Sequence, residues 1–548
     1  MSTPNVEVIV VGSGASAVHA AWALLDRNIS VEMVDVGSRD KHYSELLPDR
    51  DFVGIRTGEQ EQHRYFLGDK FEGVPFGNVR VGAQLTPGRQ FIVRHAEQLQ
   101  PLFSDSFSPM QSLAMGGLGS GWGAGAVPYI GEELDDYPIT RDDLTPHYNA
   151  VIERIGVCGP KSDDLSPFLG PMEGLLPPAE LDTNGDTVLF RYNRVRNSLN
   201  AKGFYVGRPR LAMCTVEHHG RGPLKYSDME FWSDRERAVY RPAFTVEELK
   251  RRFPKFVYTP GLLAQEFREE ADGSGVTLIA RTVAADGSLS GEPVERRARR
   301  LALAAGTFGT ARIVARSRKL YGIPIPMVCN PYIYYPCINI NAIGTKVRDR
   351  RHSLTQLSMI YDPDGTRRHL IQPQLYSYRS LLLFKLMKES PLSVKESRAL
   401  MQLLCEYFVI LGVHYEDRPG PEKNIRVERG RDGLDAIHAE YRQSPEEERQ
   451  NAESERKICG FLRQLRCFPI KAVRPGPGSS IHYGGTFPMR RDEAPNTTSP
   501  EGKLRGTSTV WLADGSTLPH LPAKGLTLTL MANADRIGTH LAREMTAP

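Results

Sequence analysis

One histidine stands in a glycine-rich turn near the C-terminus, in the segment Ser480–Met489, which reads SIHYGGTFPM. An imidazole has an unperturbed pKa of about 6.5, so it can take up or release a proton near neutral pH. The glycines that follow His482 allow the backbone to come close to a flat bound molecule. We therefore predict that His482 is a catalytic base. The alternative is a histidine that only hydrogen-bonds within its own turn.

A second glycine-rich turn, near the N-terminus, predicts what the bound molecule is. The apolar run Val6–Val11 predicts a buried parallel strand, and a glycine turn and a helical stretch over 18–25 follow it. In such a unit the helix N-terminus binds a pyrophosphate, and the glycines let it reach the backbone. Asp35 ends the next strand, about 20 residues after the turn, where an acid binds ribose hydroxyls. The dinucleotide contacts predicted from this unit are Gly12, Ser13, Gly14, Ala15, Ser16 and Asp35.

Two further segments predict additional contacts to the same dinucleotide. Residues 115–125 hold six glycines in eleven residues and lead into a strand-like run over 126–130. The embedded Trp122 argues against a flexible linker, because linkers lack large aromatic residues. Residues 303–312 again read as a strand, a glycine turn and a helix that begins near Thr310. From these segments we predict contacts from Gly116, Gly117, Trp122, Gly123, Ala305 and Gly306.

The region from about 325 to 475 has a different pattern and predicts a separate layer. Alternating apolar and polar residues predict strands over 332–343, 355–361, 369–378 and 408–415, and helices near 393–407 and 445–466. The chain then returns to the parallel sheet through a short strand over 510–513 and a closing helix over 526–541. An antiparallel sheet with helices is therefore expected to roof the dinucleotide site.

Composition excludes several classes of function. The 548 residues include 69 basic and 65 acidic side chains, a net charge of +4, which gives no support for nucleic-acid or membrane binding. Seven cysteines include no Cys-x-x-Cys pair, so we expect neither a zinc site nor a disulfide framework. The first residues have no basic leader and no run reaches about 18 apolar residues. A cytoplasmic location is the expectation.

The segments quoted above, taken in their order along the chain, resemble the glucose–methanol–choline (GMC) oxidoreductases. These flavoproteins oxidise alcohols by transferring a hydride to FAD. The resemblance rests on 12–14, 35, 116–123, 305–307, 482–486 and 514–516. The histidine motif and residues 137–148 are most similar to the pyranose oxidase group and its bacterial sugar-oxidising relatives.

The resemblance implies the cofactor, the substrate class and further contacts. It implies FAD bound non-covalently, because Gly121 stands where a histidine of pyranose oxidase bonds to the flavin. The substrate implied is a sugar, a glycoside or a sugar-like metabolite, with O2 or another carrier as electron acceptor. NAD is not expected, since no second complete dinucleotide unit is found; the oligomeric state stays open. Further FAD contacts are expected from Ala264, Asp514, Gly515 and Thr527.

One position departs from the family pattern. Most GMC enzymes place a second histidine or asparagine opposite the catalytic histidine, and Gly525 occupies that position here. Lys524 is adjacent and His520 lies five residues earlier, so either side chain is a candidate to enter the site. The departure keeps two alternatives open. One is a flavoprotein with non-redox, lyase-like chemistry, and the other is a non-catalytic binding protein on the same scaffold.

The resulting fold class is α/β: a Rossmann-like FAD-binding domain and an α+β substrate domain with an antiparallel sheet. The FAD-binding domain is expected over 1–324, with insertions at about 38–110 and 150–215 that form a lid and part of the substrate domain. The substrate domain is expected over 325–475, and 476–548 return to the FAD-binding domain with the catalytic histidine.

The remaining conspicuous residues have ordinary explanations. His218, His219 and His414 lack the spacing of metal ligands, so we expect surface or core positions. Residues 446–455 form a charge run that predicts a solvated helix face. Tyr376, Tyr378 and His414 fall on predicted strands of the substrate domain. They are candidates either to line a sugar pocket or to pack within the sheet.

Overall fold

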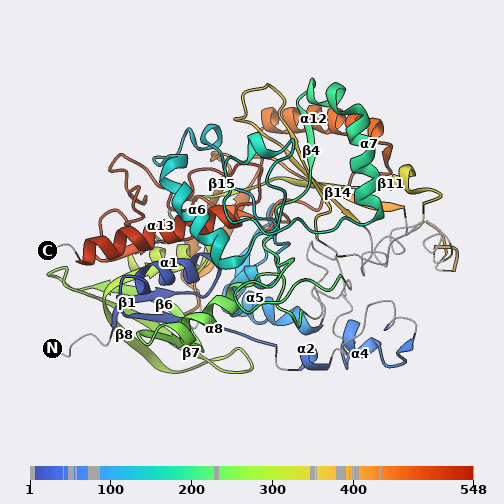
Figure 1. Cartoon of the computed structure of the whole chain (residues 1–548). Helices are drawn as coiled ribbons and strands as arrows, with labels where there is room; N and C mark the ends of the chain where they lie inside the picture. Colours follow the sequence, from blue (N-terminus) through green and yellow to red (C-terminus); the bar gives the residue numbers. More distant parts are fainter. Residues whose placement is uncertain are drawn as a thin grey trace.

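The structure is a computed structural model in which two large sheets are covered by helices (Figure 1). Residues of both sheets line a cavity. Most of the predicted helix near 393–407 lies outside the described residues, and Tyr378 lies outside them as well. The described residues are 6–40, 42–46, 55, 58–71, 87–226, 234–345, 352, 354–377, 391–393, 395–397, 399, 407–430 and 433–546.

The first sheet confirms the predicted dinucleotide-binding fold. Four of its strands run parallel side by side: β5 (Phe256–Thr259), β2 (Val31–Val34), β1 (Val6–Val11) and β8 (Leu289–Leu303). The returning strand β19 (Val510–Leu512) also pairs with β8 in parallel. β8 is longer than predicted, and its first half turns the sheet into an antiparallel meander with β7 (Val276–Val283) and β6 (Leu262–Glu269).

Alternate residues of β1 face opposite layers of helix, which explains why the whole strand is apolar. Val8 and Val10 pack with α1 (Ala15–Leu25) and the closing helix α13 (Thr527–Thr546), and Ile9 and Val11 pack with α9 (Thr307–Ser317). α1 and α13 cross closely at Gly538, where an added Cβ atom would lie 2.6 Å from the carbonyl oxygen of Ala20. The N-termini of α1 and α13 both border the cavity.

The second sheet is antiparallel, as predicted. Its strands follow in the order β17 (Cys467–Pro469), β11 (Tyr332–Asn339), β14 (Phe408–His414), β13 (Gln372–Ser377), β12 (Leu357–Tyr361) and β4 (Phe204–Gly207). The edge strand β4 comes from a segment that precedes the rest of the sheet by more than a hundred residues.

This sheet also separates its two faces by residue parity. The odd-numbered residues that pack against α12 (Pro445–Gln464) and α7 (Thr183–Asn200) are Ile333, Tyr335, Cys337, Leu375, Val409, Leu411 and Val413. Figure 1 shows these two helices covering one side of β4, β11 and β14. Even-numbered residues of β13 and the end residues of β11 and β14 face the cavity instead. The alternation along these strands therefore places one set of residues in the core and the other set at the cavity.

Shorter elements hold the two layers together. Thr140 caps the N-terminus of α6 (Arg141–Ile155), because its hydroxyl accepts the Asp143 N–H. The run over 126–130 is not a strand, because its backbone makes only an isolated contact beside Arg210 instead of a ladder. Other described elements are α2 (Tyr43–Leu46), α4 (His63–Phe66), α5 (Ala96–Leu99), α8 (Pro242–Arg252), β3 (Leu102–Phe103), β9 (Ile325–Pro326), β10 (Val328–Cys329), β15 (Lys423–Glu428), β16 (Ala436–Tyr441) and β18 (Tyr483–Gly484). Within the described residues, no helix is long and apolar enough to cross a membrane.

Candidate active site

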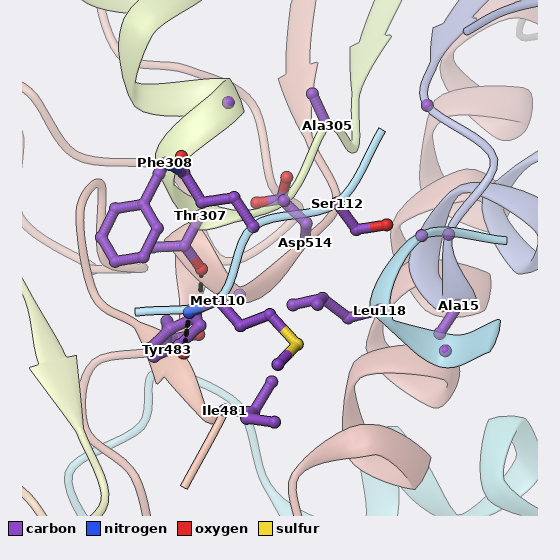
Figure 2. Close-up of a pocket in the computed structure, with 18 of the residues that line it drawn as sticks. Ala15, Met110, Ser112, Leu118, Ala305, Thr307, Phe308, Ile481, Tyr483 and Asp514 are labelled. Atoms are coloured by element: carbon purple, nitrogen blue, oxygen red, sulfur yellow. Dashed lines mark hydrogen bonds between the residues drawn. The ribbon is translucent and has the colours of Figure 1, made fainter. Parts of the chain in front are cut away.

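A cavity of about 480 Å³ lies between the two sheets. Its floor is the carboxyl end of the parallel strands, where ligands bind in α/β sheets of this kind. Figure 2 shows the centre of the cavity, where Met110, Leu118 and Ile481 point toward one another and Ala15, Ser112 and Asp514 line the side of the first sheet. The segments that meet here lie far apart in the sequence.

The predicted dinucleotide contacts gather at one end of the cavity. Gly12 has φ +99°, and a Cβ atom there would lie 2.5 Å from the carbonyl oxygen of Ala304, so only glycine fits this turn. Gly14 precedes α1 without a side-chain cap, which leaves the first N–H groups of the helix free for a ligand. The predicted contacts that line the cavity are Gly12, Ser13, Gly14, Ala15, Ser16, Asp35, Gly117, Trp122, Gly123, Ala264, Ala305, Gly306, Asp514, Gly515 and Thr527.

Gly116 is the one predicted cofactor contact that does not line the cavity. Its N–H donates to the Ser13 hydroxyl at 2.9 Å, and that hydroxyl donates to Asp35. A hydroxyl of Tyr258 also donates to the Asp35 carboxylate, at 3.3 Å. Burial raises the pKa of Asp35 to about 7. Gly116 therefore lies behind the lining and helps to hold the acid that faces it.

The Asp514 turn links the two glycine-rich ends of the site. Its carboxylate accepts hydrogen bonds from the Ser516 hydroxyl at 2.6 Å and from the Thr310 hydroxyl at 2.5 Å. Thr307 at the start of α9 donates to the carbonyl of Tyr483 at 2.9 Å, a bond drawn in Figure 2. These bonds fix the segment that carries His482 against the dinucleotide end of the cavity.

His482 is held in one orientation by a buried amide. Its ring Nδ1 lies 3.1 Å from Oδ1 of Asn330. The Asn330 Nδ2 donates to the carbonyls of Tyr415 at 2.7 Å and Pro522 at 3.0 Å, so the amide oxygen must be the atom that faces the ring. Nδ1 therefore carries the proton and donates it. Nε2 keeps its lone pair, and the bond to Asn330 is the one hydrogen bond that the ring makes within the described residues.

The electrostatics of the cavity keep this imidazole neutral. Burial lowers the pKa of His482 to about 4. His414 stacks on it, with ring centroids 5.0 Å apart, and burial together with the neighbouring ring lowers the pKa of His414 well below its usual value. Both rings are therefore neutral at physiological pH, as a base that accepts a proton must be.

The even-numbered wall of the antiparallel sheet faces His482. Tyr332, His414 and Gln372 are cross-strand neighbours on β11, β14 and β13, so they form one row across the sheet. Gly412 leaves room for this row, because a Cβ atom there would lie 2.6 Å from the Tyr332 hydroxyl. The polar and aromatic residues of this wall that line the cavity are Tyr332, Thr355, Gln372, Gln374, Tyr376 and His414.

The second predicted catalytic position is open, and its neighbours do not fill it. Gly525 lines the cavity, and a Cβ atom there would meet only the Gly125 carbonyl and Val127, at 3.8 and 3.9 Å. The prediction that Lys524 enters the site is wrong. Its ammonium is fully buried outside the cavity lining, where it pairs with Glu133 at 2.5 Å and donates to the Phe168 carbonyl.

His520 is also directed elsewhere. Its Nε2 bonds to the Glu133 carbonyl at 3.1 Å, and the ring does not line the cavity. His218 and His219 both bond to Glu153 at the surface. No cluster of metal-ligating side chains occurs within the described ranges.

Two residues of the site were not predicted, Asn330 and Gln372, whereas Tyr376 and His414 were candidates for the pocket and both line the cavity. Strand periodicity puts Gln372 and His414 on the same face as Tyr376, which was a weak signal for the wall. Asn330 lies outside the strands and gave no signal, because its role depends on three segments that meet only in the fold.

Comparison with known proteins finds similarity to oxidoreductases. Residues 423–534 match a family model described as GMC oxidoreductase. Paromamine 6'-oxidase of Streptomyces fradiae is 22% identical over 563 residues, which cover 98% of this chain and 92% of that protein. The fold is shared with two solved structures. Pyridoxine 4-oxidase from Mesorbium loti has a TM-score of 0.59 and 14% identity, over 98% of this chain and 99% of its own. Formate oxidase has a TM-score of 0.61 and 12% identity, over 100% and 99%.

The family match, the related oxidase and the shared fold agree with the motifs found along the sequence. The chain is thus similar to GMC oxidoreductases over residues 423–534, to a curated oxidase along its length and to two solved oxidases in fold.

Proposed function

We propose that this chain binds FAD non-covalently and uses it to oxidise a CH–OH group of a sugar or sugar-like metabolite. The observation that carries the proposal is the geometry of His482. A neutral imidazole, oriented by Asn330, presents a free Nε2 in the same cavity that ends in a dinucleotide cradle.

The residues at the dinucleotide end fit FAD. The backbone of Gly117 approaches Gly14 closely, since a Cβ atom at Gly117 would lie 3.4 Å from the Gly14 Cα. At Gly123 and Gly306, by contrast, an added Cβ atom meets nothing within 4 Å, so these glycines border open space. The N-terminus of α1 would hold the pyrophosphate, and Asp35 would accept ribose hydroxyls. The N-terminus of α13, with Thr527 in its first turn, would favour negative charge on the flavin ring.

Non-covalent binding follows from the residue types at the glycine-rich segment. Gly121 offers no side chain for a bond to the flavin, and a Cβ atom there would lie 2.9 Å from the Ile92 side chain. The Trp122 indole donates to the Tyr240 carbonyl at 2.7 Å, so it is fixed in place beside the cavity.

The chemistry at the substrate end is proton removal by His482. Nε2 takes the hydroxyl proton of the substrate, and the Nδ1–H bond to Asn330 holds the ring in the tautomer that permits this. The low pKa of His482, about 4, keeps Nε2 unprotonated before reaction. Bound FAD supplies the acceptor for the hydride that leaves the carbinol carbon. The electron acceptor that returns FAD to its oxidised form would be O2 or another carrier.

The wall opposite His482 supports the sugar-like substrate. Amides, tyrosine hydroxyls and aromatic faces are the groups that bind the hydroxyls and apolar faces of sugar rings. The Tyr376 hydroxyl already donates to Gln374 at 2.6 Å, which orients both side chains toward a shared ligand. The related protein named as a paromamine 6'-oxidase adds support for an amino sugar as the substrate.

The proposal is tested by anaerobic titration of the purified protein with paromamine, other sugars and glycosides, pyridoxine and formate. Acid precipitation should first release yellow FAD into the supernatant. We then expect one of the sugars to bleach the flavin band. Protein that neither contains nor takes up FAD would contradict the proposal.

A second function has one observation in its favour, the absence of a side chain at Gly525. A flavoprotein with lyase-like, non-redox chemistry would bind FAD and leave it oxidised in the presence of every sugar. That result would replace the proposal with this alternative.

A further inference from the structure

The open space at Gly525 is bordered by an amide from another part of the chain. Gln372, on β13 of the antiparallel sheet, is 1% exposed and lines the cavity. Its Oε1 accepts the Gly525 N–H at 3.1 Å. The antiparallel sheet thus reaches the position where most GMC enzymes carry their second catalytic side chain.

This hydrogen bond fixes which way the Gln372 amide points. Because the Gly525 backbone N–H is a donor, the atom opposite it must be the oxygen, and the NH2 group must point away from Gly525. That Nε2 is buried and has no hydrogen-bond partner in the described part of the chain. A buried donor without a partner is costly, by about 1–3 kcal/mol, unless a ligand completes it.

The free amide also lies beside the catalytic base. Gln372 is the cross-strand neighbour of His414, and the His414 ring stacks on His482 with centroids 5.0 Å apart. The row on the sheet therefore brings Gln372 to the same end of the cavity as His482. Two other candidates are excluded by their contacts, since Lys524 is bound to Glu133 and His520 to a backbone carbonyl.

We propose that the Gln372 Nε2 group donates a hydrogen bond to the reacting oxygen of the substrate, opposite His482, in place of the side chain that Gly525 lacks. The inference rests on the proposed oxidation of a CH–OH group. As the hydroxyl proton moves to His482, the oxygen gains negative charge and the Gln372 hydrogen bond strengthens. The oxygen then becomes the carbonyl oxygen of the product as the hydride leaves carbon.

The test compares three variants by anaerobic rapid mixing with the sugar that bleaches the wild type, with FAD content and thermal unfolding measured on each. Gln372→Leu removes both the donor and the acceptor. Gln372→Glu keeps the acceptor for the Gly525 N–H and replaces only the donor. Asn339→Leu is the control for the loss of a buried amide, since Asn339 lies on β11 of the same sheet and donates to Asn184 and Thr187, away from the cavity.

We expect Gln372→Leu and Gln372→Glu to retain FAD and to lower the limiting rate of flavin reduction by about 10- to 100-fold. The loss in Gln372→Glu should deepen between pH 6 and 9 as the new carboxyl loses its proton. Asn339→Leu should leave the limiting rate within about threefold of the wild type.

Two results would overturn the inference while the proposed function stands. One is reduction of Gln372→Leu at the wild-type rate. The other is a Gln372→Glu variant that equals the wild type throughout this pH range, because Gln372 would then serve only to hold Gly525. Failure of every sugar to reduce the wild type would instead refute the proposed function, and the inference with it.

Discussion

The Asn330 side chain is the point at which a small change should affect both stability and chemistry. Asn330→Leu keeps the volume of the side chain and removes its hydrogen bonds. One neutral bond to His482 is worth about 0.5–1.5 kcal/mol, and about 1.4 kcal/mol corresponds to a factor of ten in rate. Without the acceptor, the imidazole is also free to carry its proton on Nε2. We therefore expect the limiting rate of flavin reduction to fall about tenfold.

The same substitution has a cost in stability that can be worked out separately. The carbonyls of Tyr415 and Pro522 lose the donor that Asn330 provides, and Asn330 is 1% exposed. Each buried acceptor left without a partner costs about 1–3 kcal/mol, so the two together should lower the free energy of unfolding by about 2–6 kcal/mol. Urea unfolding measures this loss, and rapid mixing measures the rate per bound FAD.

Asn339→Leu is the matched control. Asn339 is fully buried on β11, and its amide donates to Asn184 and Thr187, away from the cavity. It should lose comparable stability and keep the rate of the wild type. The reasoning is refuted if Asn330→Leu reduces its flavin within twofold of the wild-type rate, or if both variants lose rate equally.

Three further predictions concern the cofactor end and the buried charges. Burial raises the pKa of Asp35 from 3.8 to about 7. Between pH 3.8 and about 7 the folded state therefore keeps a proton that the unfolded state has lost, and the free energy of unfolding falls as pH rises. Asp35→Asn should therefore stabilise the FAD-free protein at pH 8, by roughly 2–4 kcal/mol in chemical unfolding, and weaken FAD binding; a less stable variant would count against this. Gly12→Ala should abolish FAD uptake, because its Cβ atom would lie 2.5 Å from the Ala304 carbonyl, whereas Gly131→Ala meets nothing within 4 Å and should bind FAD normally. Lys524→Met leaves Glu133 buried without its partner and should cost about 3–5 kcal/mol of stability, with the reduction rate per bound FAD unchanged; a lost rate at intact stability would return Lys524 to the site.

The parts of the fold that depend on local sequence were predictable. The bounds of β1, the turn at Gly12 and the capped start of α6 follow from strand periodicity, glycine geometry and the Thr140 cap. The prediction of a strand over 126–130 was wrong. An apolar segment has the same composition whether it pairs with another strand or runs unpaired between two layers of the fold.

The site residues also divide according to whether their role depends on local sequence. Residues within a motif, such as Asp35 and His482, were found from their position in that motif. Lys524 was a candidate only because it adjoins Gly525, and neighbours along an irregular segment point in different directions. Gln372 and Asn330 reach the site through strand register and through contacts between segments far apart in sequence. No spacing along the chain reports such contacts.

The central claim is that His482 is the base for flavin reduction in this cavity. The most direct measurement is anaerobic single-turnover reduction of wild type and His482→Gln by the sugar that bleaches the flavin, with exposed His219→Gln as control. We expect a rate about 10²- to 10⁴-fold lower in His482→Gln, with FAD content unchanged and the control at the wild-type rate. Reduction of His482→Gln at the wild-type rate would contradict it.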